Sequence, residues 1–244
     1  MTRWGWSGFL LTASLAVAAA AGPGPGISER LAQERSAAIA SLRYELKFAV
    51  PEARSESVHG WETVRFKLRT PGPVVLDFDQ PRDRVLSVRA GDRPVEAAFN
   101  DGHLTIPASA TRSGENTIAI EFLAGDQSLN RNDDFLYTLF VPARAHLAFP
   151  CFDQPDLKAR YTLTLELPAD WQAVANGAEA GREGNVLRFA ETQPLPAYLF
   201  AFAAGKFSLE TAIRNGRTFR MLHRETDAQK VARNRDAVFD LHAQ

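Results

Sequence analysis

Residues 135–167 read FLYTLFVPARAHLAFPCFDQPDLKARYTLTLEL, and this stretch indicates how the chain folds. Pro150 and Pro155 each restrict their own backbone and push the preceding residue out of the helical region. The residues between them are therefore predicted to form a stiff, non-helical corner. Directly after the corner, apolar and polar residues alternate over residues 161–167, which is the period of a strand with one buried face. The corner therefore leads into a sheet.

Short strands are predicted along most of the chain. Alternating apolar segments are separated by Gly, Pro, Asn and Asp about every 10 residues, a spacing typical of an all-β sandwich or a pair of curved sheets. We expect Trp61 and Trp171 to fill the core. The predicted strands cover residues 44–48, 61–68, 74–78, 85–88, 103–106, 117–122, 161–167, 186–189, 198–203 and 219–222.

The N-terminus has the layout of an export signal. Residues 1–21 combine a short basic start with an apolar, alanine-rich run that ends in small residues. An uncleaved membrane anchor is the alternative, although it needs about 20 strongly apolar residues. Residues 22–43 are predicted to form a Gly/Pro spacer followed by a short lead-in helix over 27–42. We therefore expect an extracytoplasmic protein, in contact with a membrane only if the signal is retained.

The C-terminal residues 226–244 carry a helical pattern. Thr226 and Gln229 have the spacing of a capping box, and the apolar residues that follow lie at helical intervals. The chain ends in the middle of this pattern, which we interpret as a truncation. We therefore expect Val231, Val238 and Phe239 to form an exposed apolar patch.

Composition and histidine spacing exclude several functions. The chain has 28 Lys and Arg against 29 Asp and Glu, without a basic cluster among aromatic residues, so nucleic acid is not an expected partner. Cys151 is the single cysteine, so no intrachain disulfide can form. None of the five histidines has the H-E-x-x-H spacing of a zinc hydrolase. We therefore expect neither a metal site nor catalytic residues in this chain.

Several motifs occur together in one order. Their residues are Val58, His59, Gly60, Val64 and Phe66; residues 114–118; Pro150, Cys151, Phe152, Asp153, Gln154 and Pro155; Asp156, Lys158, Ala159, Tyr161, Leu163 and Leu165; and residues 192–199 with Gly205 and Phe207. In these motifs the chain resembles the N-terminal domain of the aminopeptidase N and leukotriene hydrolase type of zinc metallopeptidase. The resemblance implies a saddle-shaped, antiparallel β-sandwich domain over residues 44–225. It also implies that residues 226–244 are the first helix of a catalytic domain that holds zinc and is missing here.

The resemblance also places two substrate-cleft positions. In the family, a Gln-x-Glu or Gln-x-Gln pair lies about ten residues before the Pro-Cys element, and its acidic member helps to hold the free α-amine of the substrate. Those positions fall on Leu139 and Val141. Neither side chain can pair with an ammonium group, so either the missing domain anchors the amine alone or the cleft is more apolar. Gln154 replaces the commoner glutamate.

Four further features have both a functional and an ordinary interpretation. Cys151 could be a reactive thiol, but a buried and inert cysteine is favoured. Asp77, Asp79 and Asp83 could suggest a calcium loop, but they lack its spacing, so turn and strand-edge roles are favoured. Residues 130–134 could touch a ligand, but a solvated loop is favoured. His146 could line the cleft, but a structural role is favoured.

The sequence therefore favours a non-catalytic β domain that packs against a downstream metallopeptidase domain and caps its cleft. The resemblance implies that the full-length protein removes N-terminal residues from peptides. Two alternatives stay open: a stand-alone β-sandwich module that binds peptide or sugar, and a domain of a catalytically dead relative. An H-E-x-x-H sequence beyond residue 244 would separate the first hypothesis from the second.

Overall fold

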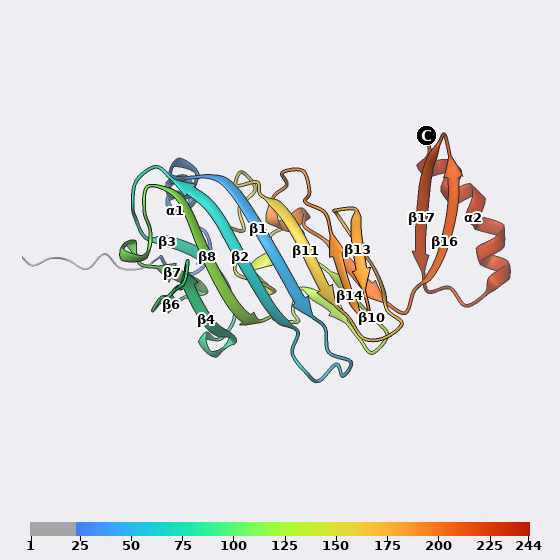
Figure 1. The fold of residues 1–244 in the computed structure, drawn as a ribbon, viewed down its shortest axis with the longest axis horizontal. Helices are drawn as coiled ribbons and strands as arrows, with labels where there is room; N and C mark the ends of the chain where they lie inside the picture. The colour runs from blue at the N-terminus through green and yellow to red at the C-terminus, as the bar shows by residue number, and fades with distance from the viewer. Residues whose placement is uncertain (1–22) are drawn as a thin grey trace, which may run out of the picture.

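The computed structural model describes residues 23–244, so the predicted export signal lies outside the described residues. Strands dominate this part of the chain and form four sheets, which confirms the all-β prediction (Figure 1). The described residues contain no helix long and apolar enough to cross a membrane.

The largest sheet has eight strands in the order β13-β14-β11-β1-β2-β8-β4-β5. All neighbours are antiparallel except β1 and β11, which run parallel with Tyr44 opposite Tyr161. The predicted sheet was wholly antiparallel, and this pair differs because more than one hundred residues of intervening structure provide the long connection that a parallel pair needs. The strands are β1 (Ile39–Ala49), β2 (His59–Leu68), β4 (Val85–Ala90), β5 (Arg93–Pro94), β8 (Gly114–Leu123), β11 (Arg160–Glu166), β13 (Glu179–Glu183) and β14 (Val186–Phe189).

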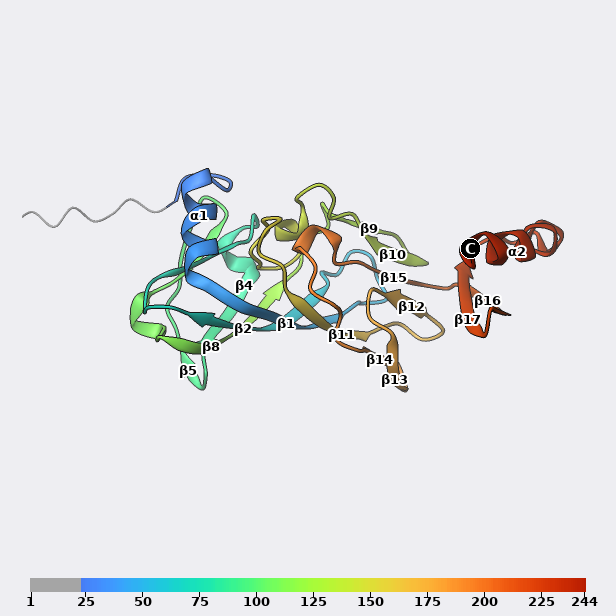
Figure 2. The same ribbon diagram turned by 90° about the horizontal axis from the view of Figure 1, so that it is seen from above.

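Two smaller sheets accompany the large sheet, and Figure 2 shows the four-stranded one and helix α1 (Glu29–Ala38) on one side of it. The four-stranded sheet has the order β12-β15-β10-β9, and the three-stranded sheet has the order β3-β7-β6. Their strands are β3 (Val74–Asp77), β6 (Ala98–Asn100), β7 (His103–Ile106), β9 (Leu129–Arg131), β10 (Phe135–Thr138), β12 (Gln172–Ala175) and β15 (Phe202–Gly205). Single 3-10 turns lie at η1 (Arg82–Arg84), η2 (Ala108–Ala110), η3 (Ala145–Leu147) and η4 (Ala197–Leu199).

An aromatic core fills the space between these layers. Tyr161 stacks on Phe200 at 4.7 Å and on Tyr44 at 5.0 Å, and Phe149 packs edge-on against Tyr44 and Phe200. Each of these rings is at least 98% buried. Since burying such a side chain contributes about 1.5–3 kcal/mol, this cluster is a main source of the stability of the domain.

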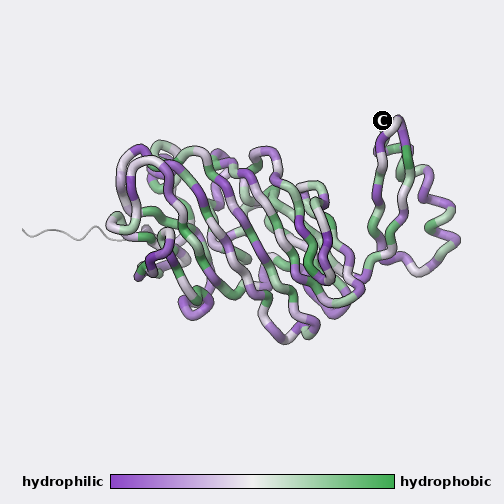
Figure 3. Tube along the Cα trace, viewed as in Figure 1, coloured by the Kyte–Doolittle hydropathy of each residue, from purple (hydrophilic) through white to green (hydrophobic). Residues whose placement is uncertain are grey.

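The other face of the large sheet is polar and carries ion pairs between neighbouring strands. Lys47 pairs with Glu166 at 3.0 Å, and Arg65 pairs with Glu45 at 2.8 Å. Figure 3 shows the resulting alternation of hydrophobic and hydrophilic positions along the strands. Trp61 lies half-buried on this polar face, stacked against His59 at 4.0 Å, so its predicted place in the core is wrong. Trp171 is buried as predicted.

Helix α1 (Glu29–Ala38) begins after Ser28, whose hydroxyl accepts a hydrogen bond from the backbone of Leu31. The prediction extended this helix to residue 42 and is wrong at its end, because Ile39 already pairs with Leu68 in the large sheet. A bulge with Ser41 at φ 55° then turns the chain into the rest of β1. Tertiary pairing therefore overrides the local helical pattern.

The predicted strands are confirmed within five residues at each end, β7 and β14 at their exact bounds, but two segments differ in kind. The segment predicted as a strand over 198–203 begins with the 3-10 turn η4, and the strand β15 starts only at Phe202. The predicted solvated loop at 130–134 is wrong at its start. Asn130 and Arg131 belong to β9, and buried Arg131 donates hydrogen bonds to the backbone carbonyls of Glu56 and Ala53.

The C-terminal part stands apart from the main body in Figures 1 and 2. It consists of the hairpin β16 (Ser208–Arg214) and β17 (Arg217–His223), with α2 (Ala228–His242) packed on the hairpin. The N-cap of α2 is Asp227 rather than the predicted Thr226, because the Asp227 carboxylate accepts from the backbone of Gln229 and Lys230. The predicted boundary near residue 225 falls between hairpin and helix, and it stays a prediction.

The apolar side of α2 is covered by this hairpin. Phe239 is buried, and Val231 and Val238 are half-buried. The predicted exposed patch is therefore wrong, because the strands that precede α2 supply its packing surface. Leu241 on the other side of the helix is exposed.

Candidate functional site

The proline-bounded corner is fixed to two strands. Cys151 and Asp77 exchange two backbone hydrogen bonds, at 2.7 and 3.0 Å, which attach the corner to the end of β3. The backbone N–H of Phe152 donates to the hydroxyl of Tyr44 on β1 at 3.0 Å. All residues from Pro150 to Gln154 are buried. The corner is therefore a rigid part of the core, as its prolines predicted.

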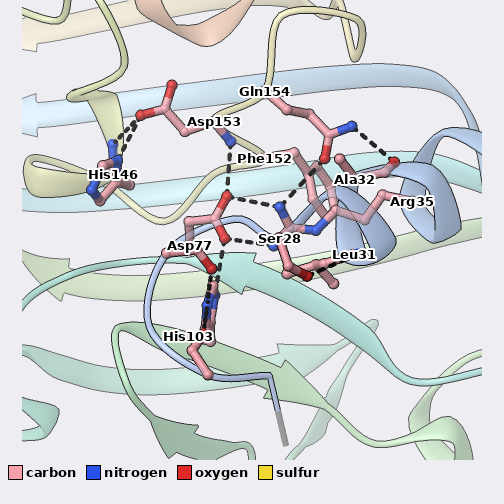
Figure 4. Close-up of polar contacts among 12 residues, drawn as sticks. Ser28, Leu31, Ala32, Arg35, Asp77, His103, His146, Phe152, Asp153 and Gln154 are labelled. Atoms are coloured by element: carbon pink, nitrogen blue, oxygen red, sulfur yellow. Dashed lines mark hydrogen bonds and ion pairs between the residues drawn. The ribbon is translucent and has the colours of Figure 1, made fainter.

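Asp77 is the centre of a buried polar network, drawn in Figure 4. Arg35 of α1 donates to both carboxylate oxygens of Asp77, at 2.9 and 2.5 Å. The backbone N–H of Asp153 donates at 3.0 Å, and the Nδ1 atom of His103 lies 3.0 Å from Oδ1. Burial raises the pKa of Asp77, but these partners outweigh it and hold the pKa below its ordinary value. Asp77 does lie at the end of the edge strand β3, as the favoured strand-edge role predicts, but its carboxylate is buried rather than solvated.

Gln154 connects the same corner to α1. Its amide nitrogen donates to the carbonyl of Ala32 and the hydroxyl of Ser36, both at 3.1 Å, and to Asp156 at 2.9 Å. Its amide oxygen accepts from Arg35 at 3.4 Å. A glutamate here could not donate in its ionised form, and it would face the carboxylate of Asp156. The glutamine therefore fits a corner that is covered by a helix.

His146 and Cys151 have the structural roles that the sequence favours. His146 lies 2.7 Å from the buried carboxylate of Asp153 through its Nδ1 atom. The thiol of Cys151 is fully buried, and burial together with the charges of Asp153 and Asp77 raises its pKa well above the ordinary value. A thiol in this position is inert.

Leu139 and Val141 lie away from this network, directly after β10. Their side chains are 43% and 63% exposed, whereas Phe140 between them is buried against Phe149 and Phe200. Because the buried ring fixes the backbone, both neighbours are held on the solvent side. The predicted cleft positions are therefore available for contact, and their role in substrate binding stays a prediction.

Arg35 and His103 are the network residues that the sequence did not single out. Arg35 lies one turn after Leu31, and both side chains are buried on the same side of α1. Because Arg35 occupies a position of the helix that otherwise faces the core, the sequence could have predicted that it has a buried acidic partner. His103 carried no such signal, because its contacts come from residues distant in the sequence.

The described residues do not fit a zinc site. Over residues 23–244, no group of three or more His, Cys, Asp or Glu side chains is arranged to hold a metal ion. The pairs Asp77–His103 and Asp153–His146 each supply only two donor side chains, which Arg35 and backbone groups already engage. No chemical step through a metal can therefore be assigned to these residues.

The family model of the peptidase M1 N-terminal domain matches residues 43–199. The chain belongs to this family. The match covers most of the main body but leaves out α1, the start of β1, the strand β15, the C-terminal hairpin and α2. It confirms the resemblance that the corner motif indicated.

Similar proteins include aminopeptidases. Aminopeptidase N of Streptomyces lividans is 23% identical over 197 residues, which cover 76% of this chain and 23% of that protein. Leucine aminopeptidase 2-1 of Meyerozyma guilliermondii is 32% identical over 112 residues, which cover 46% of this chain and 17% of that protein. The chain thus spans less than a quarter of the length of these curated relatives.

Solved structures share the fold. Native LTA4 hydrolase of yeast aligns with a TM-score of 0.62 at 22% identity, over 75% of this chain and 31% of that one. An M1 zinc metallopeptidase of Deinococcus radiodurans, bound to a Tyr-Ser-Ala substrate, aligns with a TM-score of 0.61 at 18% identity. That alignment covers 80% of this chain and 52% of the other.

Proposed function

We propose that this chain supplies the non-catalytic β domain of a zinc aminopeptidase and that the domain caps one side of the substrate cleft. Zinc and the catalytic groups would then lie in a metallopeptidase domain outside the chain. The observation that carries the proposal is the match to the M1 N-terminal domain family over residues 43–199. Residues 23–244 contain no zinc ligand set, which is consistent with a zinc site in the other domain.

Leu139 and Val141 would contact the peptide substrate. They are exposed apolar side chains on a loop whose backbone is anchored by buried Phe140. An apolar pair offers no charge partner to the α-amine of a peptide, so the downstream domain would anchor the amine alone. The pair would instead pack against apolar parts of the substrate.

The first experiment compares this chain with the full-length protein, using aminoacyl reporter substrates with and without a zinc chelator. We expect turnover from the full-length protein, loss of turnover with chelator, and no turnover from this chain. Absent turnover from zinc-loaded full-length protein would support a catalytically dead relative. Peptide or sugar binding by this chain, without any H-E-x-x-H sequence downstream, would support a stand-alone module.

A second experiment tests the cleft role of Val141. In the full-length protein, Val141→Glu would place a carboxylate where the amine anchor of the family lies. We expect KM for substrates with a free α-amine to fall by about tenfold, equivalent to about 1.4 kcal/mol. Leu86→Glu is the matched control, because Leu86 is a similarly exposed apolar residue on β4. Equal kinetics in the two variants would contradict the proposed role.

We also propose that the protein is extracytoplasmic, on the basis of residues 1–21. Fusion of the full chain to a reporter that is active only after export tests this location. Deletion of residues 2–21 should abolish reporter activity. An inactive reporter in the undeleted fusion, with the fusion protein present in the cytoplasmic fraction, would contradict the location.

A further inference from the structure

The segment before α1 contacts a buried histidine of the domain. The sequence predicts residues 22–26 to be a spacer, but the carbonyls of Gly24 and Gly26 lie 3.1 and 3.0 Å from the Nε2 atom of His103. His103 lies on β7 and is only 2% exposed. The Gly/Pro segment is therefore part of the folded domain.

The contacts of His103 call for a protonated ring. Its Nδ1 atom lies 3.0 Å from Oδ1 of Asp77, an ion-pair contact without hydrogen-bond geometry, and its Nε2 atom lies within hydrogen-bond distance of the two carbonyls. A neutral imidazole carries one N–H, so one of its nitrogens would direct a lone pair at an acceptor. Only the imidazolium offers a proton on both sides. In agreement with this geometry, the interaction of the ring with the Asp77 carboxylate raises the pKa of His103, although burial opposes the shift.

The charged groups around His103 act in both directions. The Asp77 carboxylate favours the protonated ring, and Arg35 on α1, which also pairs with Asp77, partly offsets this effect. The segment also closes one side of a cavity of about 420 Å³, whose wall includes Asp79 after β3, Asp101 in the β6–β7 turn and His146 of η3. His146 is engaged by Asp153, and Asp79 and Asp101 line the same cavity as the ring.

We propose that His103 is a proton-operated latch that holds residues 23–28 over this cavity. When the ring loses its proton, repulsion at Asp77 or at the two carbonyls releases the segment and opens the cavity. Since the protonated form is the bound one, the segment is held at low pH and released as pH rises through the pKa of His103. The latch would make the connection between the export signal and the domain sensitive to pH.

Carbon-13 relaxation at the α-carbons of Gly24 and Gly26 tests the latch, because it is unaffected by amide exchange. In the wild-type chain, we expect order parameters of about 0.8 at pH 5.5 and below about 0.6 at pH 9. The ring resonances of His103, followed over the same range, should titrate with the same midpoint. Rigid glycines at both pH values, or a midpoint unrelated to the His103 titration, would overturn the proposal.

A variant pair separates the latch from general effects of pH. His103→Gln should leave Gly24 and Gly26 mobile at both pH values, because an uncharged amide cannot replace both contacts. His59→Gln is the matched control, since His59 forms a comparable pair with Glu121, at 2.9 Å, on the polar face. The control should keep the wild-type pH response. The same pH response in His103→Gln as in wild type would also overturn the proposal.

Discussion

Two buried carboxyl groups in this domain meet the cost of burial in opposite ways. Asp77, at the corner, is 2% exposed and is surrounded by Arg35, His103 and the backbone N–H of Asp153. Glu62, in the middle of the large sheet, is 3% exposed, and neither of its oxygens has a hydrogen-bond partner among the described residues. At the corner, charged and N–H partners offset the cost of burying the carboxylate, whereas in the sheet burial raises the pKa of the glutamate and so favours its neutral form.

The two groups therefore have opposite pH dependence. Partners hold the pKa of Asp77 below its ordinary value of 3.8, so its stabilising effect is present above that value and is lost as pH falls through the lower, folded pKa. Burial raises the pKa of Glu62 well above 4.5. Its effect on stability is most favourable below that value and declines as pH rises toward the folded pKa.

The largest expected effect comes from removing the partner of Asp77. Arg35→Met should lower the free energy of unfolding by about 3–5 kcal/mol, because it leaves a buried carboxylate without its cation. Urea unfolding measures the change, and Arg30→Met, an exposed arginine of α1, is the control, with an expected change below about 0.5 kcal/mol. Adding Asp77→Asn to Arg35→Met should recover part of the loss. If the double variant loses the sum of the free energies that Arg35→Met and Asp77→Asn each lose alone, the pairing is contradicted.

Glu62 should respond in the opposite direction. Glu62→Leu is expected to increase the free energy of unfolding by about 1–3 kcal/mol at pH 8, because an unpaired polar group leaves the core. The gain should shrink toward pH 4, where the glutamate is protonated in both states. Glu62→Gln, which is neutral at every pH, should flatten the pH dependence, and thermal unfolding across this range measures both. A loss of stability in Glu62→Leu would show that the Glu62 carboxyl group forms a stabilising hydrogen bond in the folded protein.

Gln154→Glu should have a smaller cost of about 1–2 kcal/mol. The variant loses the donor to the carbonyl of Ala32 and places a carboxylate beside Asp156. Gln33→Glu is the matched control, because Gln33 lies exposed on α1, the helix that Gln154 contacts through Ala32. Equal stability of the two variants in urea would mean that the corner accepts either residue.

The smallest effect is expected on the polar face of the sheet. Arg65 and Glu45 form an ion pair at 2.8 Å, as close as the Arg35–Asp77 contacts, but each side chain is about half exposed. Arg65→Met should change the free energy of unfolding by less than about 1 kcal/mol, and about 1 M salt should remove the difference. A cost close to that of Arg35→Met would contradict the view that burial, rather than distance, sets the strength of these pairs.

The strand pattern was largely predictable, because it depends on neighbours in the sequence. Alternation placed β7 and β14 at their observed bounds, and the two prolines predicted the rigid corner. The errors lie where distant contacts compete with local preference. Ile39 leaves the helical pattern to pair with Leu68, and Trp61 lies on the polar face because its strand register directs Glu62 into the core.

For the candidate site, the sequence determined the family, the corner and the apolar residues Leu139 and Val141. These features depend on residue type and short spacing, which local backbone restriction and alternation translate directly into structure. Only the tertiary structure decided that Arg35 meets Asp77 and that Gly24 meets His103, across 42 and 79 residues. Charge pairing acts through space, so a buried pair is identified only when the fold brings its two members together.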